Sequence, residues 1–240
     1  MSGSLEMPLW SENMGLFLLA AQLTSVTTSQ EAGWTTAKRH AFLPNDAAVA
    51  QAAEALSIQA QWNASQAVNF LGVVIDKLTI SAKAQEPVML SADWLARDEA
   101  PAGGVWDYDG QTASPAIIAN PAYFANTIPP FLFLGASLVT GGAPTLDPTD
   151  KFFTIAGGTA RTGIDNLELT LENGLDAPVF LGGPTPGVIV PQDRKVSGKF
   201  DIDLSTINRT FYDEYRAGSQ VALQATFLGP VIESNVRREF

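Results

Sequence analysis

The segment GIDNLELTLENGL, residues Gly163–Leu175, has the clearest pattern in the chain. Leu167, Leu169 and Leu171 alternate with polar residues, which predicts an extended strand with one apolar face and one polar face. The polar positions are Asn166, Glu168, Thr170 and Glu172. The first question about function is therefore what this polar face contacts.

The segment RKVSGKFDIDL, residues 194–204, has the same alternation and predicts a partner strand. Val196, Phe200 and Ile202 fall on its apolar side, and Leu204 follows them. The polar side carries Lys195, Ser197, Lys199, Asp201 and Asp203. Between the two strands the Gly- and Pro-rich sequence LGGPTPGVIVPQD predicts a loop.

Two further stretches alternate in the same way. Residues 77–94 predict a hairpin, because apolar residues from Leu78 to Ala82 and from Val88 to Trp94 recur at every second position on either side of AQEP. Residues 221–227 predict another strand. The sequence thus indicates a mainly β fold built from antiparallel strands.

Residues 205–218 have a different period and predict a short amphipathic helix. Ile207, Phe211 and Tyr215 recur every four residues, and Gly218 follows as a helix stop. We therefore expect one short α-helix flanking an antiparallel β-sandwich or barrel-like structure.

The chain is expected to divide at about residue 53. Residues 1–53 have the least regular pattern and are interpreted as an N-terminal arm and contact region. Residues 54–240 are interpreted as a β-sandwich domain with a long loop excursion at about 98–130, where five prolines interrupt any period.

The composition excludes several classes of function. With 46% hydrophobic and 16% charged residues, the 240-residue chain can bury a core. Its net charge of -11 argues against specific nucleic-acid binding and against attachment to anionic membranes, since both depend on Lys and Arg. The apolar run GLFLLAAQL is about half as long as a membrane-spanning helix, so we expect no membrane insertion.

Catalytic and metal-binding motifs are missing from the sequence. There is no Cys, and His40 is the single His, which excludes the common zinc sites and a Cys-His pair. His40 is interpreted as a surface or structural residue in a polar loop. The segment GGTARTGID lacks the Lys and the Ser or Thr that a phosphate-binding loop requires, and is interpreted as a turn. We therefore predict no enzymatic activity, no cofactor and no metal.

Two alternatives rest on side chains of the middle region. Trp106 and Tyr108 could form a sugar-binding platform, which makes a carbohydrate-binding β-sandwich module the second hypothesis. A hydrolase is the third hypothesis, and it would use a cluster of carboxylates. These are Asp93, Asp98, Glu99, Asp107 and Asp109.

The order of these segments resembles the phage major tail (tail tube) protein family. The hairpin NFLGVVIDKLTISAKAQEPVMLSADWLAR resembles the family's first hairpin. IDNLELTLENGL, RKVSGKFDIDL and FYDEYRAGSQVAL resemble its later half, with a strand, a long loop, a strand, a short helix and a closing strand. The resemblance covers about residues 54–230.

The resemblance implies a structural virion protein, made in the host cytoplasm and assembled into the tail. Such subunits are expected to form hexameric rings that stack into a hollow tube for genome passage. The implied partners are other copies of the chain and the tape measure, tail terminator and baseplate or tip proteins. The polar face of the opening strand would then line the lumen as an acidic wall that does not bind DNA. The candidate lumen-facing residues are Asn166, Glu168, Thr170, Glu172, Asp201 and Asp203.

Overall fold

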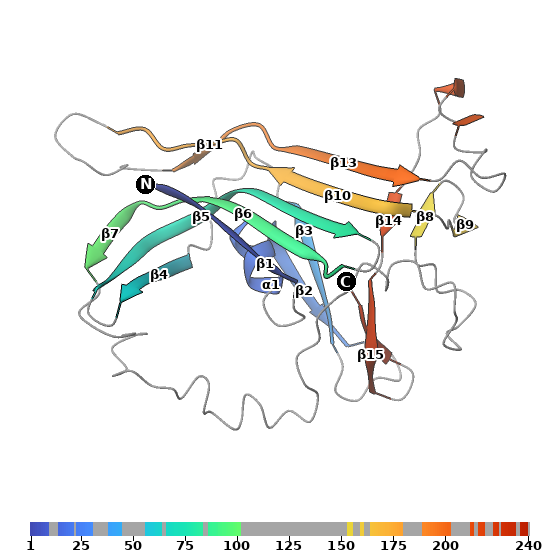
Figure 1. The fold of residues 1–240 in the computed structure, drawn as a ribbon, viewed down its shortest axis with the longest axis horizontal. Helices are drawn as coiled ribbons and strands as arrows, with labels where there is room; N and C mark the ends of the chain where they lie inside the picture. Colours follow the sequence, from blue (N-terminus) through green and yellow to red (C-terminus); the bar gives the residue numbers. More distant parts are fainter. Residues whose placement is uncertain are drawn as a thin grey trace.

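The computed structural model confirms a mainly β fold with antiparallel sheets (Figure 1). In the part of the chain that the structure describes, α1 (Met14–Ala20) is the one helix whose two ends are both defined, and it has seven residues. The described residues are 1–9, 14–21, 23–30, 38–44, 56–63, 66–83, 86–101, 153–155, 159–160, 164–179, 189–202, 212–213, 216–218, 223–225, 227–233 and 236–239.

Among the described residues, the largest sheet contains seven strands. Five of them, called the main sheet below, lie in the order β1, β6, β5, β10 and β13, and each neighbouring pair is antiparallel. Its strands run from left to right in the upper half of Figure 1, and α1 lies below them in this view. The strand bounds are β1 Ser2–Pro8, β5 Gln66–Lys83, β6 Met89–Leu95, β10 Ile164–Glu172 and β13 Lys195–Ile202. Both strands of each sequence-predicted hairpin are therefore present.

The long strand β5 belongs to two groups of strands. Its second half pairs with β6 and β10, whereas its first half pairs with β4 (Leu56–Asn63) and β7 (Asp98–Pro101) at one end of the sheet. Gly72 lies between the halves with φ of 64°, a conformation that side chains other than glycine rarely adopt. The first four residues of the expected excursion thus form a strand, and residues 102–130 lie outside the described part.

The apolar face of the main sheet forms the core. Leu78, Leu90 and Leu167 come from three adjacent strands and are each less than 4% exposed. Phe17 of α1 and Phe227 pack into the same cluster. Trp94 belongs to this core as predicted, and its ring lies 4.9 Å from that of Phe70 between centroids. On β5, β6 and β10 the apolar positions read from the sequence are buried or half-buried, whereas Val196 on the apolar side of β13 is 69% exposed.

The N-terminal residues take part in the main sheet. β1 pairs along its whole length with β6, and α1 follows and contacts β5. Residues of β2 (Leu23–Ser29) and β3 (Arg39–Pro44) form a hairpin. Whether residues 1–53 act as a contact region stays a prediction.

Short strands complete the described part of the chain. β14 extends β8 and β9 as a small sheet near one end of the main sheet, and two further hairpins pair β11 with β12 and β15 with β16 (Figure 1). Their bounds are β8 Phe153–Ile155, β9 Thr159–Ala160, β11 Leu175–Asp176, β12 Val190–Pro191, β14 Leu223–Ala225, β15 Leu228–Glu233 and β16 Val236–Glu239.

The helix predicted over residues 205–218 is described only near its end. Residues 212–213 and 216–217 are helical, and Gly218 has φ of 65°, as a helix-terminating glycine does. The Arg216 guanidinium lies 5.9 Å from the ring centroid of Tyr212, one turn earlier. Ile207, Phe211 and Tyr215 lie outside the described residues.

Candidate functional site

The polar face of the main sheet gathers the polar residues of all five strands. On β10, Glu168 and Glu172 are exposed, whereas the leucines on the opposite side are buried or half-buried. The same alternation on β5, β6 and β13 places their polar positions on this face, because directly paired residues share a face. The result is a broad polar surface opposite the core.

The register places acidic and basic residues beside one another in this surface. Glu172 lies opposite Lys77 of β5 and Lys195 of β13, and Lys77 in turn lies opposite Asp93 of β6. Opposite charges at paired positions stabilise a sheet by about 0.2–1 kcal/mol for each pair. This row of the sheet is therefore balanced in charge.

Glu168 is also paired with a lysine. It lies opposite Lys199 of β13 on one side and Ser81 of β5 on the other. Each of the two glutamates of the opening strand consequently has a lysine directly across the sheet.

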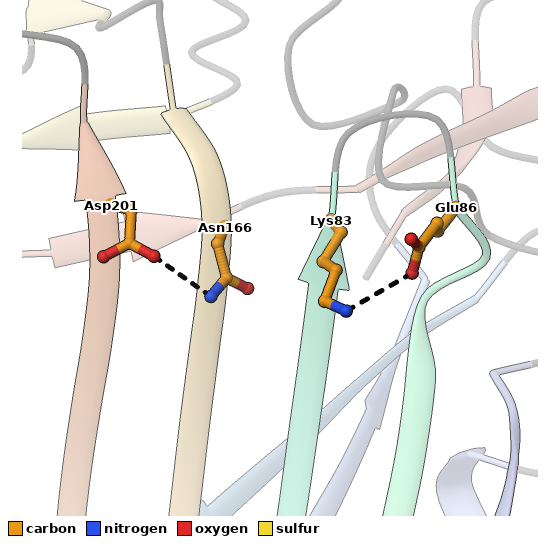
Figure 2. Close-up of polar contacts among 4 residues, drawn as sticks. All are labelled: Lys83, Glu86, Asn166 and Asp201. Atoms are coloured by element: carbon orange, nitrogen blue, oxygen red, sulfur yellow. Dashed lines mark hydrogen bonds and ion pairs between the residues drawn. The ribbon is translucent and has the colours of Figure 1, made fainter.

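Asn166 and Asp201 meet near the other end of the same two strands. The amide Nδ2 of Asn166 donates a hydrogen bond of 3.2 Å to Oδ2 of Asp201 (Figure 2). Lys83 lies opposite Asn166 on β5, but its side chain is directed to the turn, where Nζ is 3.7 Å from Oε2 of Glu86 (Figure 2). Both charged side chains of that ion pair are 60% exposed, so it contributes little to stability.

Thr170 is the least accessible of the candidate residues. It is 9% exposed, and its Oγ1 lies 3.2 Å from Oγ1 of Thr79 across the strand pair. Ser197 lies opposite it on the other side. Thr170 therefore joins neighbouring strands, while the glutamates on either side of it carry the exposed charge. Asp203 lies outside the described residues.

Lysines are concentrated on this face. The full sequence contains six lysines, and the face holds four of them, although the chain carries a net charge of -11. The four are Lys77, Lys83, Lys195 and Lys199. The sequence could not reveal this grouping, because it depends on the pairing of strands about 90 residues apart.

The loop that joins β10 to β13 is fixed at its base by Asn173. This side chain is 2% exposed, and its Nδ2 donates to the carbonyl oxygens of Ala21 at 3.0 Å and Ile75 at 2.9 Å. Its Oδ1 accepts a bond of 2.9 Å from Nε of Arg194. Partial burial lowers the pKa of Arg194 from its ordinary value, because desolvation disfavours the charged guanidinium.

The other residues considered from the sequence are not brought together. His40 is exposed and lies on β3, not in a loop, where its Nδ1 is 2.9 Å from Oγ1 of Thr28. The strand forms because residues 39–44 pair with β2. Asp93 lies on the polar face of β6, whereas Asp98 and Glu99 are on β7.

The remaining members of the two alternative sites lie outside the described residues. These are Trp106, Asp107, Tyr108 and Asp109. Among the described residues, no group of three or more His, Cys, Asp or Glu side chains is arranged to hold a metal ion. Nothing in the described structure favours the carbohydrate-binding or the hydrolase hypothesis.

Comparison with known proteins identifies the family. The model of the phage tail tube protein family matches residues 1–232, nearly the whole chain. The chain belongs to the phage tail tube protein family. None of the curated proteins compared with the chain matches it.

The family defines the role of the chain in general terms. This tail tube protein is a structural component of the bacteriophage virion, and its place is the tail. Family membership implies self-assembly and association with other tail proteins, and it is consistent with the prediction that the chain is not an enzyme. Within the described residues, no helix is both long and apolar enough to cross a membrane.

Proposed function

We propose that this tail tube protein assembles into hexameric rings that stack into a hollow tube, and that the phage genome passes through the tube. The observation that supports this most directly is that the main sheet buries its apolar face in the core and exposes the opposite, polar face. Sheets of this kind can continue from one copy to the next and surround a channel.

The polar face lines the channel in this proposal. Its candidate lumen residues are Asn166, Glu168, Thr170, Glu172, Asp201 and Asp203. A channel for DNA must not hold the phosphates, and phosphate binding requires cationic groups that are not already neutralised. The lysines of this face have carboxylates as neighbours across the strands or in the adjacent turn, which supports a wall that lets DNA pass.

The tape measure, tail terminator and baseplate or tip proteins are the proposed partners. A tube of fixed length needs a ruler within its channel and proteins at its two ends.

Electron microscopy of the purified protein tests the proposal. We expect rings and stacked tubes with six subunits in each ring, and a channel reached by the side chains of Glu168 and Glu172. A protein that stays monomeric at every concentration and salt tested contradicts the assembly. Tubes with both glutamates on the outer surface contradict the lumen assignment alone.

A further inference from the structure

The two outer strands of the main sheet differ in charge. On the polar face of β1, Glu6 is the one charged side chain, with Ser2 and Ser4 at the neighbouring positions. On β13 the same face carries Lys195 and Lys199 in its first five residues and Asp201 near its end. One edge of the sheet is therefore acidic, and the other begins with two lysines.

Both edges are accessible. Ser2, Ser4 and Glu6 are exposed, and so is every residue from Lys195 to Lys199. In the part of the chain that the structure describes, no strand pairs with the outer side of either edge. Such edges offer unpaired backbone groups to another strand.

An exposed apolar side chain lies at one edge. Val196 is on the apolar side of β13 and is 69% exposed. On the apolar side of β1, Leu5 and Met7 are half-buried against the core. A strand added to β13 with this pattern would extend the apolar face and cover Val196.

The order of the strands fixes how two copies can join. Because all neighbours in the five-stranded sheet are antiparallel, β1 and β13 run in the same direction. A rotation about a ring axis preserves strand direction, so β13 of one copy would meet β1 of the next copy in parallel. In such a contact each copy uses both of its edge strands, and the copies close into a ring. In a two-fold contact each copy pairs the same edge strand with itself and leaves its other edge strand unpaired.

We propose that β13 of one copy pairs in parallel with β1 of the next copy, with Glu6 of that copy beside Lys195 and Lys199. The two strands have seven and eight residues. If Glu6 is level with Ser197, both lysines are its diagonal neighbours, and a shift of two residues either way places it directly opposite one of them. The inference rests on the proposed function and adds the edges and the charges that select the partner.

Crosslinking tests which edges meet. The chain has no Cys, so Ser4→Cys and Ser197→Cys can be introduced singly and together and treated with a short bis-maleimide. The two positions are at opposite edges of one sheet, about 19 Å apart at the usual strand spacing, so a short crosslink must join two copies. We expect a ladder of covalent oligomers that ends at the ring size for the double variant, and no oligomer for either single variant.

A charge reversal provides an independent measurement. Glu6→Lys should raise the protein concentration needed for assembly by about tenfold or more, because it places like charges side by side. High salt should reduce that effect by screening. Glu99→Lys makes the same change at an exposed site on β7 and should assemble as the wild type does.

The outcomes separate this inference from the proposed function. Tubes that form normally while the double Cys variant gives no ladder overturn the edge pairing and leave the tube function intact. Dimers from either single Cys variant also overturn it, since they indicate a two-fold contact. A wild-type protein that never assembles overturns both proposals.

Discussion

Asn173 is the buried polar side chain that joins three parts of the chain. It follows β10, and its hydrogen bonds reach Ala21 after α1, Ile75 in β5 and Arg194 before β13. A buried amide is stable only when its donors and acceptors are paired, and here both ends of the amide have partners. The same side chain thus holds the N-terminal region and the base of the long loop against the sheet.

Replacing Asn173 with Ala should lower the free energy of unfolding by roughly 2–4 kcal/mol, because buried carbonyl groups and the Arg194 guanidinium lose a partner. Asn166→Ala is the matched control. Its side-chain hydrogen bond in the described structure, to Asp201, is exposed, so we expect a loss below about 0.5 kcal/mol. Urea unfolding at a concentration where the protein is a single species gives both values, and equal losses would contradict the role of Asn173.

At the scale of elements, the strands with strict alternation could be predicted from the sequence. The register could not, because single-sequence alternation says which residues share a face but not which strand lies opposite. β10, β13 and the second half of β5 were identified in this way, and so was the polar face with Glu168 and Glu172. Lys195 and Lys199 were expected on the polar side of the partner strand, whereas Lys77, which lies opposite Glu172 on the other side, became visible only with the pairing of β5 and β10.

Two parts of the main sheet escaped the sequence analysis for different physical reasons. The first half of β5 continues into Val73, Val74 and Ile75. These three consecutive residues are all buried, because the strand has a bulge where it passes from one group of strands to the other. No alternation survives there. β1 is short, and its first residues are Gly3 and small polar residues, so the sequence shows no clear alternation there. In the structure the Trp94 side chain covers Gly3, which places this position on the apolar face.

Gly3→Ala should weaken the attachment of β1 to β6. A Cβ atom at this position would overlap the Trp94 indole and would lie 2.7 Å from its Cε2. Forced overpacking costs roughly 1–3 kcal/mol, and the edge strand can escape it by separating from the sheet. Hydrogen exchange of residues 2–8 should therefore become faster, while Ser4→Ala, an exposed change at the next residue, leaves it unchanged. Full protection of β1 in the Gly3 variant would contradict this account.

At the scale of the whole molecule, charge is distributed unevenly. The chain has 25 acidic residues against 14 Lys and Arg residues, yet its polar face places a lysine opposite each glutamate of β10. The acidic excess must therefore lie mostly on other surfaces. A balanced face can be exposed to DNA without attracting it, provided that the carboxylates remain charged.

Removing two of these carboxylates should make the wall bind DNA. In Glu168→Gln with Glu172→Gln, Lys195 and Lys199 lose the negative charges directly opposite them, so tubes of the double variant should retain short duplex DNA in a sedimentation assay. Retention should fall steeply as salt is raised, because released counterions drive phosphate binding. Both side chains are exposed, so folding should change little, by about 1 kcal/mol for each lost pair at most.

The control for this last experiment changes the net charge of the protein by the same amount, but at residues outside the polar face. Asp98→Asn with Glu99→Gln removes two exposed carboxylates from β7 and leaves the polar face of the five-stranded sheet as it is. Tubes of the control should sediment without DNA, as wild-type tubes should. Equal retention by the two double variants would mean that net charge alone attracts DNA, and absence of retention in both would mean that the lysines of this face do not reach the channel.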